Sequence, residues 1–366
     1  MLCHTQTCRQ CILGIKPYVP GKPIDEVKRE LGIEDVVKLA SNENPLGPSP
    51  MAIEAIQAAA KDVALYPDGS CYTLRRDLSA RLGVEPGMLI FGAGGDEVIF
   101  HLALAFLNVG DETVQSQVTF SEYETTAKLM DCKICCVPVD GYNADIDEML
   151  EQVTDKTKLF IITNPNNPTG TLTPLKKVEE VLNKLPPQCI LLLDEAYYEY
   201  VDDLNYTRSI EWIKEGRNVL ALRTFSKIYG LAGLRIGYGV APESIIQVLE
   251  RVRAPFNVNS LAQAAAIASL KDPDQVTRSR EQNRRSKEYF YAELDGMGVS
   301  YTPTQANFLW VDTGTDCKKV FSELLKRGVI VRTGDIFGCP THIRVSTGTD
   351  EQNTRFIGAF REALGR

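Results

Sequence analysis

The chain has 366 residues, of which 44% are hydrophobic and 24% are charged, as in ordinary soluble globular proteins. This length exceeds that of most single hydrophobic cores, so we expect one large domain and a smaller one. The net charge of −8 argues against a nucleic-acid-binding surface, which requires clustered Lys and Arg.

The N-terminal residues contain three cysteines with the spacing C-x4-C-x2-C (Cys3, Cys8 and Cys11) and a nearby His4. A closed zinc site needs four ligands, and no second cysteine pair has suitable spacing, so we expect a loosely ordered arm over 1–15 and no metal. The arm lacks the layout of a secretory signal, and no apolar run approaches the length of a membrane span. We therefore expect a cytoplasmic protein that does not bind membranes.

Short apolar segments alternate with helical patterns between about residues 88 and 241. Several of the segments are almost continuously apolar, which is typical of strands covered by helices on both faces. The pattern predicts an α/β domain with a mostly parallel sheet. The expected strands are 88–91, 113–117, 133–139, 158–163, 189–194, 218–224 and 235–241.

The pattern changes after Pro255, where helices are expected at 260–270 and 274–294. Three short apolar segments near a helix at 317–327 then predict a smaller α+β domain. Thr349 and Gln352 have the spacing of a capping box that opens a last helix. We expect residues 41–255 to form the large domain, 256–366 the small domain, and 16–40 to pack with the small domain.

A lysine follows the strand expected at 218–224. Thr224 ends that strand and Ser226-Lys227 lies in the loop beyond it, where open α/β sheets bind ligands. A lysine with a lowered pKa is a nucleophilic amine suited to imine chemistry, and Arg235 can bind a phosphate with its guanidinium. For a Ser-Lys pair alone, a solvated surface lysine would be the better interpretation.

Two further motifs follow neighbouring strands. Asp194 ends the apolar run CILLL, so its carboxylate could pair with a protonated pyridine nitrogen and keep that ring able to accept electrons; an N-cap role is the alternative. Tyr197 could donate to a phenolic oxygen of the same ring. The stiff loop NPNNPTG (164–170) directs the amide of Asn167 over the strand ends.

The segment GAGGDE (92–97) joins a strand to a helix. Backbone amides of Gly94 and Gly95 at the helix start can bind an anion, assisted by the helix dipole. The nucleotide fingerprint G-x-G-x-x-G fails because Glu97 occupies its last glycine position. This disfavours a nicotinamide-dependent oxidoreductase and favours a single phosphate as the bound group.

Taken in order, these motifs resemble those of the histidinol-phosphate aminotransferases, within the fold-type-I aminotransferases. The resemblance covers residues 16 to 366 and implies a pyridoxal-phosphate-dependent homodimer with shared active sites. The motifs that carry it are SNENPLGPSP (41–50), YPDGS (66–70), GAGGDE (92–97), TFSEY (119–123), NPNNPTG (164–170), DEAYYEY (194–200), RTFSKIYGLAGLRIGY (223–238), PTQANF (303–308) and the tail from IVR to HIRVSTGT.

The resemblance implies a role for each site residue. Lys227 would hold pyridoxal 5′-phosphate as a Schiff base and move the proton, while Asp194 binds the pyridinium. Tyr197 and Asn167 would bind the phenolic oxygen. Tyr123 would stack on the ring, with core packing as the alternative. The phosphate would be bound by Gly94, Gly95, Thr224, Ser226, Arg235 and, from the partner subunit, Tyr66.

The resemblance also implies how substrates bind. Arg332 and Arg344 would bind acid groups, although for each arginine alone a surface ion pair is the alternative. Tyr18 of the partner subunit would reach the substrate phosphate, and Asn307 would lie close by. The implied reaction is a ping-pong exchange of the amino group between glutamate and imidazole-acetol phosphate, which gives 2-oxoglutarate and histidinol phosphate.

Some features leave alternatives open. Ala93 and Gly95 stand where the family more often has Asn and Ser or Ala, which removes side-chain donors to the phosphate, and Val118 replaces a usual proline. An aromatic amino acid aminotransferase and a threonine-phosphate decarboxylase are the nearest alternative functions. A ligand-sensing regulator would need an additional DNA-binding domain, for which the residues before the matched region are too few.

Overall fold

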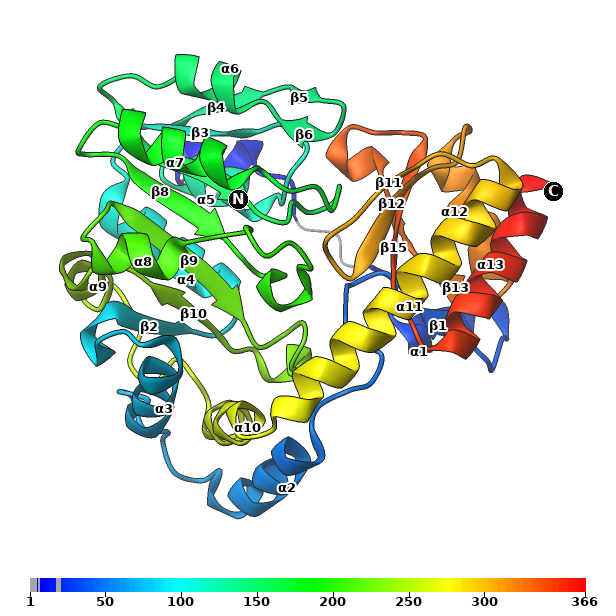
Figure 1. The fold of residues 1–366 in the computed structure, drawn as a ribbon, viewed down its shortest axis with the longest axis horizontal. Coiled ribbons are helices and arrows are strands. Elements are labelled where there is room, and N and C mark those ends of the chain that lie inside the picture. Colours follow the sequence, from blue (N-terminus) through cyan, green and yellow to red (C-terminus); the bar gives the residue numbers. More distant parts are fainter. Residues whose placement is uncertain (1–4, 6, 18–20) are drawn as a thin grey trace.

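A seven-stranded sheet is the centre of the larger lobe in this computed structural model, which describes residues 5, 7–17 and 21–366 (Figure 1). The strand order is β2-β10-β9-β8-β7-β3-β4, and only β10 runs antiparallel to its neighbours. The mostly parallel sheet predicted from the sequence is confirmed. Its strands are β2 (Leu89–Gly92), β3 (Glu112–Ser116), β4 (Lys133–Val137), β7 (Thr157–Thr163), β8 (Ile190–Asp194), β9 (Val219–Thr224) and β10 (Gly237–Val240).

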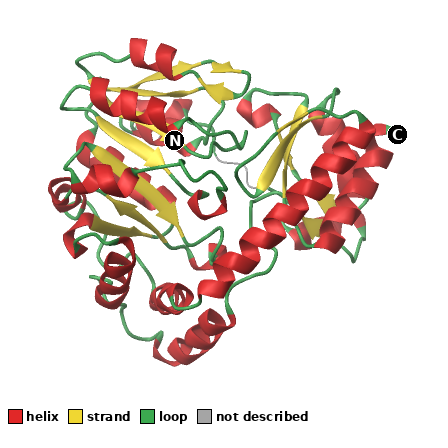
Figure 2. Ribbon diagram, in the orientation of Figure 1, coloured by secondary structure: helices red, strands yellow, loops and turns green. Residues whose placement is uncertain are grey.

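Helices cover both faces of this sheet (Figure 2). Side chains alternate along each strand, so Leu159 and Ile161 of β7 face one hydrophobic core while Phe160 and Ile162 face the other. The first core is completed by α4 (Gly95–Phe106), α5 (Glu122–Leu129) and α9 (Glu243–Leu249). The second is completed by α3 (Tyr72–Leu82), α6 (Ile146–Glu151), α7 (Leu175–Lys184), α8 (Ser209–Lys214) and α10 (Ser260–Leu270).

The smaller lobe contains a four-stranded antiparallel sheet with three helices packed on one face. The strand order is β11-β12-β15-β14, and the last helix begins with the predicted capping box of Thr349 and Gln352, which is confirmed. The strands are β11 (Tyr301–Thr302), β12 (Phe308–Asp312), β14 (Arg332–Thr333) and β15 (His342–Ser346). The helices are α11 (Pro273–Met297), α12 (Cys317–Lys326) and α13 (Asp350–Leu364).

The described N-terminal residues contact both lobes. The strand β1 (Val37–Lys38) pairs with β13 (Val329–Ile330), and α1 (Ile24–Leu31) packs beside this pair through Val27. Of the arm expected to be loosely ordered, residues Gln10–Gly14 form a 3-10 helix, η2, that lies against α5. The Arg9 guanidinium, just before η2, donates to the Leu129 carbonyl at 2.5 Å. Cys3, His4 and Tyr18 lie outside the described residues.

The helix α10 packs with the large lobe, although the sequence placed it in the small domain. It contacts α2 (Pro50–Ala59) and α3, and its alanines at 262, 265 and 266 are buried in the core beneath the seven-stranded sheet. A helix rich in alanine allows this close approach to a second helix. We therefore propose a domain boundary within α11 instead of at residue 256.

Short elements complete the chain. A two-stranded hairpin of β5 (Val139–Asp140) and β6 (Asn143–Ala144) extends from the edge of the large lobe. The remaining 3-10 helices are η3 (Ala60–Asp62), η4 (Pro86–Met88), η5 (Tyr198–Tyr200), η6 (Ala232–Leu234) and η7 (Asp335–Phe337). Over residues 5, 7–17 and 21–366, no helix is both long and apolar enough to cross a bilayer, and no three His, Cys, Asp or Glu side chains are grouped as metal ligands.

A buried ion pair links the ends of β8 and β9. Arg223 and Glu195 are fully buried, with 2.8 Å between guanidinium and carboxylate. We expect Glu195→Gln to lower the free energy of unfolding by about 3–5 kcal/mol, because it leaves the arginine charge buried without its counterion. Urea denaturation of both proteins measures this difference. In the exposed pair of Arg208 and Glu179, Glu179→Gln should cost about 1 kcal/mol or less, and similar losses at both sites would contradict the prediction.

Candidate active site

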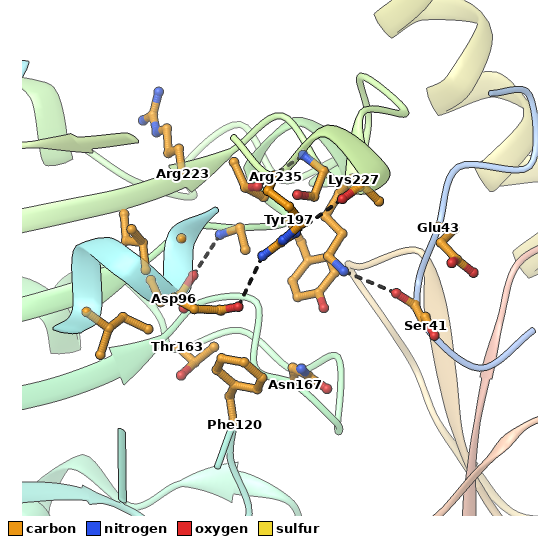
Figure 3. A pocket seen from close by; sticks show the side chains of 18 residues that line it. Ser41, Glu43, Asp96, Phe120, Thr163, Asn167, Tyr197, Arg223, Lys227 and Arg235 are labelled. Carbon is orange, nitrogen blue, oxygen red and sulfur yellow. Dashed lines mark hydrogen bonds and ion pairs between the residues drawn. The ribbon is translucent and has the colours of Figure 1, made fainter. Parts of the chain in front are cut away.

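A cavity of about 270 Å³ lies where the central parallel strands end (Figure 3). The strands β7, β8 and β9 end at Thr163, Asp194 and Thr224, and all three of these residues line it. This is the edge at which open parallel sheets bind ligands. The other residues predicted from the sequence that line it are Gly95, Asn167, Tyr197, Ser226, Lys227 and Arg235.

Lys227 projects into the cavity from the loop that follows β9. Its Nζ donates to the Ser41 carbonyl at 3.1 Å and lies 5.7 Å from the centre of the Tyr197 ring. Burial, followed by the positive charge of Arg344, lowers the pKa of Lys227 to about 8. A substantial fraction of this amine is therefore neutral and nucleophilic in mildly alkaline solution.

Asp194 lies in the same cavity with only 5% of its surface exposed. The Tyr123 hydroxyl donates to one carboxylate oxygen at 2.6 Å, and the Ala196 backbone N–H donates to the other at 2.9 Å. Burial outweighs these hydrogen bonds and raises the pKa of Asp194 to about 6. A cationic ring nitrogen in the cavity would favour the carboxylate form, so Asp194 suits such a partner.

The raised pKa of Asp194 predicts how the stability of the cofactor-free protein depends on pH. The unfolded chain loses this proton near pH 4 and the folded protein near pH 6, so Asp194 increasingly opposes folding as the pH rises through this range. Relative to Asp194→Asn, the wild-type free energy of unfolding should fall by about 3 kcal/mol between about pH 4 and pH 7. Urea denaturation at several pH values tests this. A pH-independent difference in the free energy of unfolding between wild type and Asp194→Asn would contradict the prediction.

A further group of residues that line the cavity can bind a phosphate. The N-terminus of α4 at Gly95 faces Thr224, Ser226 and Arg235, which together offer backbone amides, hydroxyls and a guanidinium. Gly94 has φ +91°, a backbone conformation that favours glycine, and the Arg235 guanidinium lies in the space that a Cβ there would fill. Such a donor set fits a phosphate dianion.

Asp96 is a residue of this group that the sequence did not single out. Its carboxylate lies in the first turn of α4 and accepts from Arg235 at 3.2 Å (Figure 3). Acidic residues are favoured in a first helical turn, so the Asp-Glu pair after the glycines was the available signal. The contact holds the Arg235 side chain beside Gly94.

The structure corrects the expected position of Tyr123. Its ring is buried in the core beneath α4 and does not line the cavity; its hydroxyl supports Asp194 instead. Phe120 lines the cavity, with its ring edge-on to Tyr123 and the two centroids 5.7 Å apart. The reason is local geometry: Phe120 precedes α5, whereas Tyr123 lies in its first turn and points inward. We propose Phe120 as the residue that covers the cofactor ring.

A second cavity of about 110 Å³ adjoins the first and shares Ser41, Phe120, Asn167, Tyr197 and Lys227 with it. The predicted substrate residues Arg332 and Arg344 line this second cavity. Arg344, buried on β15, donates to the Asn167 side-chain oxygen at 2.5 Å and to the Ala40 carbonyl at 2.6 Å. Two arginines therefore lie next to the lysine, where an acid group of a substrate could bind.

Tyr197 lies where the two cavities meet. Its hydroxyl accepts a hydrogen bond from the Asn42 amide at 2.8 Å, and burial raises the pKa of Tyr197 to about 12, so the phenol remains protonated. Asn42, which the sequence did not single out, is held in turn by Asn307, whose amide donates to the Asn42 carbonyl at 3.0 Å. Asn307 is fully buried and is not among the residues that line the two cavities, so the contact that the structure shows is its support of Asn42.

Tyr66 is 83% exposed and does not line the cavity of its own chain. Its ring stacks on Phe256, with centroids 4.8 Å apart. The position leaves Tyr66 available to another subunit.

The sequence model of the family described as aminotransferase class I and II matches residues 34–360. The chain belongs to this family. A histidinol-phosphate aminotransferase of Moorella thermoacetica is 53% identical to this aminotransferase over 98% of the chain and 93% of the relative. One from Caldicellulosiruptor saccharolyticus is 46% identical, over 97% of the chain and 99% of the relative.

The fold of this aminotransferase is also shared with solved structures. The histidinol-phosphate aminotransferase of Sinorhizobium meliloti, in complex with pyridoxal-5′-phosphate, superposes with a TM-score of 0.90 at 27% identity, covering 97% of this chain and 96% of that one. Pyridoxal phosphate is the cofactor of this family. The cavity fits it, because a lysine of lowered pKa, a buried carboxylate and a phosphate-binding helix N-terminus lie around one space.

Proposed function

We propose that this aminotransferase interconverts imidazole-acetol phosphate and histidinol phosphate, with glutamate and 2-oxoglutarate as the other pair, in histidine biosynthesis. The observation that supports it best is the pair of joined cavities: one contains Lys227 and Asp194, and the other contains Arg332 and Arg344. Both substrates carry acid groups that two arginines can bind. The near full-length similarity to histidinol-phosphate aminotransferases supports the same assignment.

The cofactor, when bound, supplies an electron sink that stabilises negative charge on the substrate carbon. Asp194 would pair its carboxylate with the ring nitrogen, and Phe120 would cover the ring. Tyr197 and Asn167, which line both cavities, would bind the ring oxygen with a hydroxyl and an amide. The N-terminus of α4, Thr224, Ser226 and Arg235 would hold the phosphate.

Lys227 has two tasks. Its Nζ, neutral at mildly alkaline pH, would hold the cofactor as a covalent ligand. As a free amine, Nζ would take up and return the proton of the substrate carbon. Nζ donates to the Ser41 carbonyl, and both residues line both cavities, which supports a role for this amine on either side.

We also propose that the protein is a cytoplasmic homodimer with shared active sites. Tyr66 and Phe256 lie on a surface where Leu65 and Tyr72 are also largely exposed. An apolar patch of this kind is typical of a protein–protein interface. Tyr66 would reach the cofactor phosphate of the partner subunit, and Tyr18, which is outside the described residues, its substrate phosphate. Sedimentation equilibrium of wild type and Tyr66→Ala tests the dimer.

Steady-state rates with three amino donors test the substrate. We expect kcat/KM for histidinol phosphate to exceed that for phenylalanine by at least about a hundredfold, because only the former offers a phosphate to the arginines. O-phosphothreonine should release no carbon dioxide. A preference for phenylalanine would instead identify an aromatic amino acid aminotransferase, and carbon dioxide release a decarboxylase.

A further inference from the structure

The hairpin of β5 and β6 has an unusual residue at its tip. The two residues between the strands, Gly141 and Tyr142, have φ of +50° and +71°. A two-residue hairpin turn of this kind favours Gly or Asn at both positions, and a bulky side chain there is strained. A strained backbone conformation is stable only when contacts with the surrounding structure hold it. The contacts of the Tyr142 side chain therefore show what holds this turn.

The Tyr142 side chain, from the hairpin of the large lobe, contacts the small lobe. Its hydroxyl lies 2.8 Å from His342 Nε2 on β15, and the ring centroids are 5.1 Å apart. His342 is 6% exposed, stacks on Trp310 and has its other ring nitrogen 3.0 Å from the Thr341 hydroxyl. Tyr142 therefore meets an imidazole whose orientation is already fixed from two other sides.

This contact is connected to the substrate arginine. His342 and Arg344 are two residues apart on β15, so their side chains project from the same face of the sheet. Trp310, which stacks on His342, lies directly opposite Arg344 on β12. The contact between Tyr142 and His342 therefore restrains the part of β15 that carries Arg344.

A second connection runs through the loop between β7 and α7. The Thr171 hydroxyl donates to the Tyr142 carbonyl at 3.1 Å, and the same loop carries Asn167, which accepts from Arg344. The hairpin, this loop and β15 therefore contact one another in a ring: Tyr142 contacts His342 on β15, Arg344 on β15 contacts Asn167 in the loop, and the loop contacts the hairpin again through Thr171. Two of these contacts, Asn167 with Arg344 and Tyr142 with His342, join the lobes.

We infer that Tyr142 and His342 are positioning residues that hold Arg344 in place for the acid group of the substrate. The inference rests on the proposed role of Arg344 in substrate binding. In this proposal the Tyr142 side chain fixes β15 against the large lobe, and this contact offsets the strain of the turn. Loss of the contact should weaken the binding of acidic substrates and leave the chemistry at Lys227 unchanged.

The test compares Tyr142→Phe with the wild-type holoenzyme. Spectral titrations should give a Kd about threefold to tenfold higher for both glutamate and histidinol phosphate, the effect of one lost hydrogen bond. The rate of the half-reaction at saturation should stay within about twofold. Histidinol, which carries no acid group, should show an unchanged Kd. Because glutamate is measured as well, the inference remains testable if histidinol phosphate proves not to be a substrate.

Two further measurements separate positioning from a general structural role. The chain has three histidines, so ¹⁵N-histidine spectra should show a shift of the His342 signal alone in Tyr142→Phe. Tyr142→Asn supplies a residue that the turn favours, and it should raise Kd for both acids without lowering the midpoint of thermal unfolding. Unchanged Kd values for the two acids in both variants, or an equal rise for histidinol, would overturn the inference.

Discussion

Lys227→Ala is expected to lower the rate of transamination by about 10⁴-fold or more, because it removes the nucleophile that binds the cofactor and the group that moves the proton. The amine lies in the cavity beside Asp194, and burial with Arg344 lowers its pKa to about 8. A steady-state assay coupled to 2-oxoglutarate consumption measures the loss. The variant should also lack the visible absorbance band of a lysine-bound cofactor.

Two matched variants show whether the nucleophile or the charge matters. Lys227→Arg keeps a positive charge but cannot become neutral, so it should be as inactive as Lys227→Ala. Lys214→Ala removes an exposed lysine on α8 and should leave the rate unchanged. A Lys227→Arg variant with more than about a hundredth of wild-type activity would mean that Lys227 acts only through its charge.

Asp194→Asn is expected to lower kcat/KM by about 10²–10³-fold, the effect of losing one preorganised electrostatic partner in a buried site. The carboxylate is 5% exposed and receives hydrogen bonds from Tyr123 and the Ala196 backbone, so it is held in one orientation. An amide cannot keep the ring nitrogen protonated, and the ring then accepts electrons less well. Steady-state kinetics measure kcat/KM, and the absorbance band should remain because Lys227 is intact.

Asp194→Glu is the control, since it restores the charge with one extra methylene. We expect it to retain clearly more activity than Asp194→Asn, even if the longer side chain disturbs the bonds from Tyr123 and Ala196. Equal activity in the two variants would show that the geometry of the side chain matters and its charge does not. Wild-type activity in Asp194→Asn would remove the carboxylate from the mechanism.

The sequence predicted the large sheet well because its strands are short, apolar and followed by distinctive loops. Asp194 ends such a strand, Lys227 and Asn167 follow two others, and the parallel arrangement of β7, β8 and β9 brings them to one edge. Apolar runs identify the strands, and ligands bind at the carboxyl ends of parallel strands; both inferences can be made from a sequence. The strand ends therefore predicted the centre of the site.

Contacts between segments far apart in the chain could not be predicted in this way. Phe120 and Tyr123 are equally aromatic, and only the start of α5 between them decides which ring faces the cavity. Asn307 contacts Asn42 beside the site, and the two residues are 265 positions apart along the chain. The packing of α10 on α2 likewise depends on alanine side chains, and the sequence of α10 does not indicate which helix those alanines contact.

The most direct test of the central claim is to identify the residue that binds the cofactor. The purified holoenzyme is treated with borohydride, which reduces a lysine-bound cofactor to a stable adduct, and is then digested and analysed by mass spectrometry. The adduct should lie on the peptide that contains Lys227 and should be absent when histidinol phosphate is added before reduction. An adduct on another lysine, or no adduct in a protein that shows the visible band, would contradict the account.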